Sequence, residues 1–351
     1  MGLLSTVSYL GIDIGTSSIK IVELKKVKGR PALSSYGFSE GKDSSLSIDW
    51  QNNPKKAAQV INKIRLEAGI AGRQAVAALP TYAVFSSVLN LTNVDPKEID
   101  AAVRWEAKKV IPVALEDMIL DWRRIEDEPG QASVPGNFKI LLTGAPRTLV
   151  KKYIDIFKEA QINLLSLETE TFSLVRALLG KDKSVIMMVE LGTNTTDIAV
   201  VDKGIPVLSR SIDVGGLTIT KAIGDNLGVG LERAEQFKYD MGGTALESSG
   251  QDVVPKTIIE TINPIMNEVK YVLNMYESKN NKRVEKIVLS GGASLLASFS
   301  DYLAKELNLN VIIGDPWNRL SYPAELKPVL DEIGPRMSVA VGLALRQLDS
   351  N

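Results

Sequence analysis

LGIDIGTSSIKIVEL, residues 10–24, decides the fold. Its apolar side chains alternate with other residues in the period of two that is typical of strands, and an acid, a glycine and three hydroxyl residues interrupt them in the middle. A Gly-Thr-Ser-Ser turn between two strands exposes several backbone N–H groups on one side, and such a nest binds phosphates. The glycine allows a close approach of oxygens. The stretch predicts a phosphate-binding hairpin, with a purely structural hairpin as the alternative.

The hairpin has an internal echo in VELGTNTTDIAVV, residues 189–201, which again runs strand, acid, Gly-Thr turn, strand. A repeat array needs at least three copies at a short period, whereas these two stand about 180 residues apart. We therefore expect two related half-molecules that face each other and clamp a polyphosphate. The expected phosphate contacts come from both turns: Gly15, Thr16, Ser17, Ser18, Lys20, Gly192, Thr193, Asn194, Thr195 and Thr196. Asp13 and Glu190 precede the turns, where acids can hold the waters of a Mg²⁺ ion.

Three further segments suit a nucleotide. IVLSGGASLLASF, 287–299, is a buried strand that runs into Gly291-Gly292-Ala293, where an aromatic base could lie close to the backbone. DVGGLTITKAI, 213–223, places Gly215-Gly216 before a helix whose N-terminus favours anions. In LERAEQFKYDMG, 231–242, Glu235 and Lys238 share a helix face and could reach ribose hydroxyls together. The alternatives are small residues needed for packing and a surface ion pair.

Composition narrows the chemistry. The 351 residues include no cysteine and no histidine, so disulfides, thiol chemistry and imidazole catalysis are excluded. Carboxylates, lysines, hydroxyls and a hard cation remain. The net charge of −1 does not favour nucleic acid or an anionic membrane. Neither a signal peptide nor a membrane-spanning apolar run is evident, so we expect a cytoplasmic protein without direct membrane insertion.

Strands and helices alternate along the chain, which predicts the α/β class. Helices are expected at 54–69, 169–179, 294–307 and 338–348, and polar connections at 39–53 and 126–136. Residues 83–163 form a segment of their own with the order βαββα. Its elements are expected at 83–91, 95–110, 118–124, 138–144 and 147–160.

The order of motifs resembles the actin-like ATPase superfamily: GIDIGTSSIK, ELGTNTTD, GG before a helix, AEQFK, LSGGAS and PRMSVAVGLAL. The resemblance implies two ribonuclease-H-like halves around a cleft that binds ATP or ADP with Mg²⁺. The first half would comprise 1–82, 164–184 and 335–351, and the second 185–334. By resemblance, Asp13, Gly15 and Lys20 take the first-loop roles, and Glu190, Gly192 and Thr193 the second-loop roles.

The inserted segment 83–163 is similar in position to the 1C subdomain of the FtsA and PilM families. An Ile-Pro followed by an acid pair within 95–122, and ETFSLVRAL at 170–178, resemble the PilM family. The chain also stops just after its last helix, where FtsA continues to a membrane-binding tail. Glu190 stands where relatives generally carry Asp, so nucleotide binding with at most slow hydrolysis is expected. Glu170 would position the attacking water, or it is simply an acid favoured at a helix N-terminus.

Resemblance to the PilM family implies a scaffold of the type IV pilus inner-membrane platform, in a ring or other homo-oligomer. Its partner would be the N-terminal cytoplasmic tail of a PilN-like membrane protein, bound as an extended peptide beside the inserted segment. The residues expected at this groove are Val84, Phe85, Val88, Leu89, Arg104, Trp105, Lys108, Lys109 and Ile111. The alternative for each is core packing or a solvated charge.

Two other functions stay open at this point. One is a filament-forming cell-division ATPase of the FtsA kind, which polymerisation on lipid would support. The other is a small-molecule kinase, which the inserted segment and the lack of a polar sugar pocket disfavour.

Overall fold

The computed structural model describes residues 7–39, 53–126, 134–243, 256–296 and 299–349. Most of the expected connections 39–53 and 126–136 therefore lies outside the described residues.

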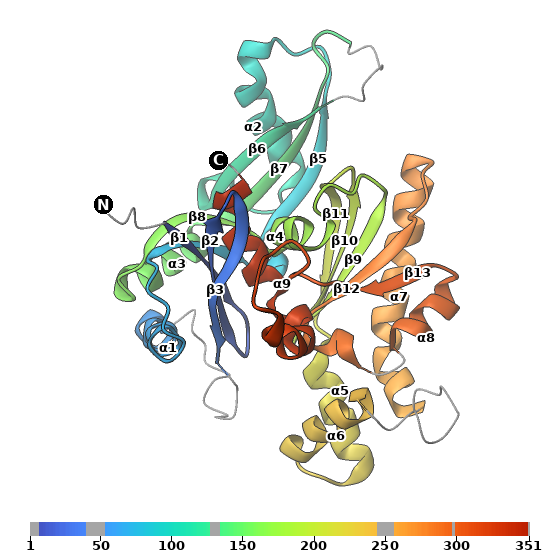
Figure 1. Ribbon diagram of the computed structural model, residues 1–351. Coiled ribbons are helices and arrows are strands. Elements are labelled where there is room, and N and C mark those ends of the chain that lie inside the picture. The colour runs from blue at the N-terminus through green and yellow to red at the C-terminus, as the bar shows by residue number, and fades with distance from the viewer. Residues whose placement is uncertain (1–6, 40–52, 127–133, 244–255, 297–298, 350–351) are drawn as a thin grey trace, which may run out of the picture.

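Two five-stranded sheets of identical topology form the body of the molecule (Figure 1). In each sheet three strands pair antiparallel and two further strands add in parallel. The first sheet has the order β3-β2-β1-β4-β8, with β1 (Ser8–Ile14), β2 (Ile19–Val27), β3 (Arg30–Phe38), β4 (Gln74–Leu79) and β8 (Asn163–Thr169). The second has the order β11-β10-β9-β12-β13, with β9 (Ile186–Leu191), β10 (Thr196–Asp202), β11 (Ile205–Ile212), β12 (Lys286–Ser290) and β13 (Asn310–Ile313). The duplicated topology confirms the prediction of two related halves.

The first sheet is covered on both faces. On one face α1 (Pro54–Glu67) and α3 (Arg147–Glu159) bury the alternating residues Leu10, Ile12 and Ile14 of β1. Helix α1 begins where the sequence predicts, because the side chain of Asn53 accepts from the N–H of Lys56 and Pro54 occupies the first turn. On the other face lies α9 (Lys327–Asp349), which buries Val22 and Leu24 of β2.

Helix α9 is longer than predicted. It begins at Lys327 and passes Pro335, whereas the sequence favours a start at Ser338. Its C-terminal half lies between the two sheets together with α4 (Glu170–Leu174), which continues as a π-helical turn, Val175–Leu179. The end of β1 and the start of α4 are thereby fixed relative to the second half.

The helices of the second half pack on its sheet as one core. They are α5 (Gly216–Leu227), α6 (Leu231–Gly243), α7 (Lys256–Asn280) and α8 (Phe299–Leu307). The helix expected at 294–307 is replaced by a 3₁₀ turn, Gly292–Leu295, followed by α8. Among the described helices, none combines the length and hydropathy that a membrane span requires.

The inserted segment forms a three-stranded antiparallel sheet in the order β5-β7-β6, with α2 on one face (Figure 1). Its elements are β5 (Phe85–Leu91), α2 (Ile99–Val110), β6 (Met118–Ile125) and β7 (Phe138–Pro146). The predicted fifth element, α3, follows directly in sequence but packs on α1, and its side chains are buried in the first half's core. The unit boundaries themselves stay a prediction.

Candidate functional site

The two glycine turns lie against each other where the two halves meet, at the site where the sequence predicts a nucleotide cleft. In the first, the N–H of Gly15 donates to the carbonyl of Ser18 at 3.0 Å, and in the second, the N–H of Gly192 donates to the carbonyl of Thr195 at 2.9 Å. The hydroxyls of Ser17 and Thr193 are 2.6 Å apart and hydrogen-bonded. The structure thus brings together the two loops that the sequence echo predicts to be partners.

Charged residues occupy equivalent positions beside both turns. The register of β1 and β2 pairs Asp13 with Lys20, and the register of β9 and β10 pairs Glu190 with Asp197. Lys20 Nζ lies 2.8 Å from Asp13 Oδ2. Burial alone would lower the pKa of Lys20, but the charges of Asp13, Glu190 and Glu170 raise it above its ordinary value. Sequence reasoning missed Asp197, although the echo places it at the position that Lys20 holds in the first turn.

Glu170 lies at the start of α4, where its Oε2 accepts from the backbone N–H of Thr81 at 2.7 Å and from Thr81 Oγ1 at 3.0 Å. Burial raises the pKa of the Glu170 carboxyl to about 8, and the charges of Asp197 and Asp13 add to this. The hydrogen bonds from Thr81 act in the opposite direction. Glu170 therefore belongs to a group of acidic residues beside the two turns, which we call the acidic cluster. Its members are Asp13, Glu170, Glu190 and Asp197.

Glu190, near the end of β9, is the predicted acid beside the second turn. Its Oε2 is buried without a hydrogen-bond partner. Burial raises the pKa of this carboxyl well above its ordinary value, as do the charges of Glu170, Asp197 and Asp13. Such an orphaned oxygen suits a cation or its water. Within the described residues no three acidic side chains form a metal-binding group, and Mg²⁺ in proteins commonly completes its shell with waters and phosphate oxygens.

The glycines before α5 have a different role from the predicted one. The N–H groups of Gly216 and Leu217 donate to the carbonyls of Gly192 and Thr193 at 2.9 and 2.8 Å, so they are not available to an anion in this arrangement. A Cβ atom at Gly215 would lie 2.6 Å from the carbonyl oxygen of Thr193. These glycines let the start of α5 support the second turn from behind.

The predicted ribose and base residues lie near each other. Lys238 Nζ donates to Glu235 Oε2 at 2.7 Å and to Thr220 Oγ1 at 2.9 Å, and burial lowers the pKa of Lys238. A Cβ atom at Gly216 would lie 3.5 Å from Lys238 Nζ and 3.2 Å from the Cβ atom of Ala293. The Glu235–Lys238 pair of helix α6 thus lies beside the turn that follows β12.

The turn after β12 depends on Gly291, which has φ +84°, where a Cβ atom would overlap the carbonyl oxygen of Leu191. Its N–H donates to the carbonyl of Pro335 in α9 at 3.0 Å. Arg336 follows on α9, close to Gly292, and its Cζ atom lies 5.4 Å from the centroid of the Phe38 ring. Sequence reasoning gave Arg336 no role, because only the fold places α9 at this turn.

The raised pKa of Glu170 predicts a pH dependence of stability. A carboxyl group whose pKa is higher in the folded chain binds its proton more tightly there. The free energy of unfolding therefore falls as pH rises from 4.5, the ordinary value, to about 8, and levels off above. We expect Glu170→Gln to reduce this slope by up to about 1.4 kcal/mol per pH unit. Urea unfolding without nucleotide at several pH values measures it, with Glu67→Gln on the exposed surface of α1 as control. An unchanged slope in Glu170→Gln would contradict the assignment.

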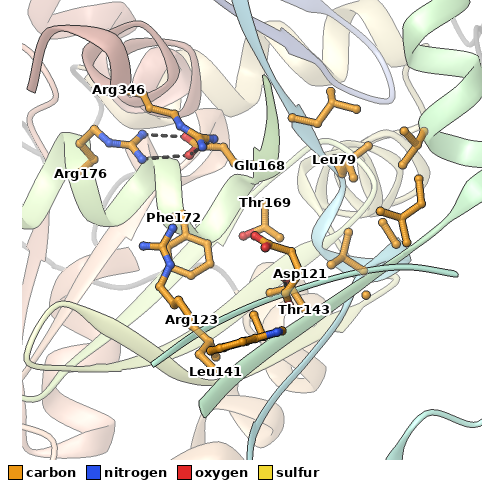
Figure 2. A pocket seen from close by; sticks show the side chains of 17 residues that line it. Leu79, Asp121, Arg123, Leu141, Thr143, Glu168, Thr169, Phe172, Arg176 and Arg346 are labelled. Atoms are coloured by element: carbon orange, nitrogen blue, oxygen red, sulfur yellow. Dashed lines mark hydrogen bonds and ion pairs between the residues drawn. The ribbon is translucent and has the colours of Figure 1, made fainter. Parts of the chain in front are cut away.

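A pocket of about 220 Å³ lies between the inserted sheet and the first half (Figure 2). The inserted sheet lines it mainly with alternating residues of one face, Ile119, Asp121 and Arg123 of β6 and Leu141, Thr143 and Ala145 of β7, and also with Trp122 and Gly144. The first half lines it with Leu79, Val84, Val150, Leu167, Glu168, Thr169, Phe172, Arg176 and Arg346.

The polar wall of the pocket is a half-buried ion-pair group. Arg176 donates to both carboxylate oxygens of Glu168, at 2.6 and 2.9 Å, and Arg346 donates to Glu168 Oε2 at 3.1 Å. Across from it, the guanidinium of Arg123 lies 5.2 Å from the centroid of the Phe172 ring (Figure 2). The pocket therefore combines apolar walls with arginines, a composition suited to a peptide.

Of the residues predicted to contact a partner peptide, Val84 alone is among those lining this pocket. Val88 pairs with Leu141 and lies on the same face of the sheet. Leu89 and Ile111 are buried in the core of the inserted segment, which corrects the expectation that they face a peptide. Phe85 packs against the same core.

The remaining residues of that prediction belong to α2. Trp105 is 64% exposed, and the Lys109 ammonium lies 5.9 Å from its ring centroid. Arg104 and Lys108 are also exposed and do not line the pocket. The alternating polar and apolar residues of β6 are the signal that could have found the pocket.

Comparison with known proteins identifies relatives of the whole chain. The family described as type IV pilus assembly protein PilM matches residues 11–348. The structure of a PilM–PilN type IV pilus biogenesis complex superposes with a TM-score of 0.81 at 24% identity, over 97% of this chain and 98% of that one. MreB 5 of Spiroplasma citri, solved bound to AMPPNP, superposes with a TM-score of 0.52 at 13% identity, over 99% of this chain and 98% of that one.

Sequence similarity also extends to the cell division protein FtsA of Enterococcus faecalis (strain ATCC 700802 / V583). The two are 22% identical over 338 residues, which cover 85% of this chain and 76% of that FtsA. The structural likeness establishes the actin-like ATPase fold, and the family match spans nearly the whole chain. This chain therefore belongs to the family of type IV pilus assembly protein PilM and is related to FtsA.

Proposed function

We propose that the protein is a nucleotide-binding scaffold of the type IV pilus inner-membrane platform, which binds the N-terminal cytoplasmic tail of a PilN-like membrane protein. The observation that carries the proposal is the pocket between the inserted sheet and the first half, in a chain whose fold resembles that of a PilM–PilN complex. The protein would work on the cytoplasmic side of the inner membrane, held there by its partner, and a ring or other homo-oligomer would fit this role.

The cleft fits ATP or ADP with Mg²⁺ on three observations. The turns at Gly15 and Gly192 have the glycines and hydroxyls that phosphates need, and Lys20 supplies a cation beside them. The buried Glu190 Oε2 has no partner. Asp13 and Glu190 would hold the metal ion or its waters, Glu235 and Lys238 the ribose, and Gly291, Gly292 and Ala293 the base. A relative with this fold was solved bound to AMPPNP.

Hydrolysis would be slow at most. Bound Mg²⁺ would supply charge neutralisation on the phosphates. Glu170 is the group to position water, and at neutral pH burial keeps much of it protonated, because its pKa is about 8. Glu190 is one methylene longer than the aspartate expected at this position, and effective catalysis is sensitive to ångström-scale placement. Binding, more than turnover, is what these residues support.

The pocket suits an extended apolar peptide. Its aliphatic walls, with Leu79 and Leu167 from the first half and Leu141 from the inserted sheet, would take aliphatic side chains. Thr143 and Thr169 offer hydroxyls to a peptide backbone, and Arg123 lies beside the Phe172 ring at the mouth. A short tail could therefore be held by both its side chains and its main chain.

We expect Phe172→Ala to weaken binding of a PilN-type peptide about tenfold, which corresponds to about 1.4 kcal/mol. The reason is the loss of a ring that lines the pocket and makes a cation–π contact with Arg123. The measurement is isothermal titration with a synthetic peptide of the N-terminal residues of the PilN-like protein from the same organism.

Trp105→Ala is the matched control. This aromatic residue of α2 is exposed and does not line the pocket, so its loss should leave peptide affinity unchanged. Absence of peptide binding by the wild-type protein would refute the proposed function. A loss in Trp105→Ala with none in Phe172→Ala would move the binding site to α2.

A filament-forming ATPase of the FtsA kind is the second candidate, favoured by the sequence similarity to FtsA. Sedimentation of the purified protein with lipid vesicles and ATP separates the two. Polymers on vesicles, without binding of the PilN-type peptide, would favour this candidate.

A further inference from the structure

Two short chain segments connect the pocket with the acidic cluster. Each segment has residues that line the pocket and one residue, Thr81 or Glu170, that takes part in a hydrogen bond at the acidic cluster. The segment 79–84 lines the pocket with Leu79 and Val84, and between them stands Thr81. The segment 168–172 lines the pocket with Glu168, Thr169 and Phe172 (Figure 2), and among them stands Glu170. In each segment, one partner of the hydrogen bonds between Thr81 and Glu170 stands between residues that line the pocket.

The two segments leave the first sheet side by side. Strands β4 and β8 run parallel, and Leu79 pairs with Thr169 at their carboxyl ends. Beyond that pair, β4 continues through Pro80 into a 3₁₀ turn, Thr81–Ala83, and β8 continues into α4. The turn and the helix are thus adjacent elements; Leu79 and Val84, which flank the turn, and Phe172 of the helix line the pocket.

Thr81 joins the two segments through Glu170. The Oε2 atom of Glu170 accepts both the backbone N–H and the hydroxyl of Thr81. Both bonds go to one oxygen, so the position of the carboxylate follows the position of the 3₁₀ turn. The same turn packs against β11 of the second half and leads directly into β5 of the inserted sheet. A shift of the inserted sheet relative to the first half would therefore move the donors that orient Glu170.

We propose that Thr81 is a positioning residue that couples the pocket to the cleft, so that an extended apolar peptide in the pocket and a magnesium nucleotide in the cleft each raise the other's affinity. This inference rests on the proposed function and adds a regulatory link to it. A peptide between the inserted sheet and the first half fixes the 3₁₀ turn, and the fixed turn holds Glu170 in place before nucleotide arrives. The second ligand then binds more tightly, because the conformational entropy cost of ordering its site has already been met by the first.

The coupling is measured as a ratio of affinities. Titrating an ATP analogue with Mg²⁺ into the protein, with and without saturating PilN-type peptide, gives the coupling factor. We expect a factor of at least about 5 in the wild-type protein. Linkage requires the same factor when peptide is titrated with and without nucleotide, which is an internal check.

Three variants assign the coupling to Thr81. Thr81→Ala removes the hydroxyl but keeps the backbone N–H that donates to Glu170, so it should lower the factor clearly below the wild-type value, while each ligand alone still binds. Thr81→Ser restores the hydroxyl and should restore the factor. Thr143→Ala is the matched control, because Thr143 also lines the pocket but its hydroxyl donates to the carbonyl of Asp121. It should keep the factor, whatever it does to peptide affinity.

The outcomes separate the inference from the proposed function. If both ligands bind the wild-type protein with a factor near one, the coupling is refuted and the proposed function stands. An equal factor in Thr81→Ala and the wild type would leave coupling in place but refute the role of Thr81. Failure of either ligand to bind the wild-type protein would overturn both proposals.

Discussion

Lys20→Met is expected to lose at least about 100-fold in affinity for ATP with Mg²⁺, or about 2.7 kcal/mol. Lys20 is ion-paired with Asp13, and its side chain is only 17% exposed. Without it, Asp13, Glu170 and Glu190 would repel the phosphates that enter between the two turns. Removing one partner of a buried ion pair also costs about 3–5 kcal/mol of folding stability, so the folding of the variant is checked before its affinity is compared.

The test is isothermal titration of ATP at fixed ionic strength and Mg²⁺ concentration, with folding checked by circular dichroism. Lys25→Met is the matched control, since Lys25 lies on the same strand, near its other end, where it pairs with Ser8. A folded Lys20→Met variant that binds ATP within about threefold of the wild type would rule out a role for Lys20 in the nucleotide site.

The duplicated architecture could be predicted from the sequence because its signal is local and occurs twice. LGIDIGTSSIKIVEL and VELGTNTTDIAVV each contain the end of one strand, the turn and most of the next strand, so the period of two and the turn residues are visible without any partner. The predicted meeting of the two turns is confirmed by the hydrogen bond between Ser17 and Thr193. The same echo also contained the position of Asp197, which the prediction did not use.

The pocket could not be predicted in the same way, because its walls come from parts of the chain far apart in sequence. Leu79, Leu141, Phe172 and Arg346 meet only after the inserted sheet folds against the first half. The prediction instead took apolar residues from β5 and α2, where hydrophobicity marks the core of the inserted segment. An apolar side chain in a sequence indicates that it is buried, but it does not indicate which element covers it.

The prediction that α3 belongs to the inserted segment was also misled by adjacency in sequence, since α3 packs on α1. The helix follows β7 directly, which suggests one unit, but its partner α1 lies about ninety residues earlier, and sequential elements are neighbours only roughly two-thirds of the time. Helix α9 shows the opposite case. Its motif was recognised, yet its early start at Lys327 and its contact with the turn at Gly291 depend on tertiary packing.

The packing of α9 depends on two glycines that allow backbones to approach. On one side a Cβ atom at Gly11 of β1 would overlap the carbonyl oxygen of Ala340 and lie 2.6 Å from the amide nitrogen of Ala344. On the other side a Cβ atom at Gly342 would overlap the carbonyl oxygen of Ser173 in α4. Because backbone atoms lie on both sides, α9 has no room to yield by a side-chain rotation. Its position in turn fixes Pro335, whose carbonyl accepts from the N–H of Gly291 in the turn after β12.

We therefore expect Gly11→Ala to lower the free energy of unfolding by about 3 kcal/mol or more, at the upper end of overpacking effects. Guanidinium unfolding followed by far-ultraviolet circular dichroism measures it. Gly230→Ala is the matched control, since no atom lies within 4 Å of its Cβ position and its φ is not positive. As a helix-capping position it should cost no more than about 1 kcal/mol. If Gly11→Ala is as stable as Gly230→Ala, then α9 can move away from β1 without cost. The turn at Gly291 would then be free to move relative to the glycine turns at Gly15 and Gly192, and under the proposed function nucleotide affinity in the Gly11→Ala variant would report that movement.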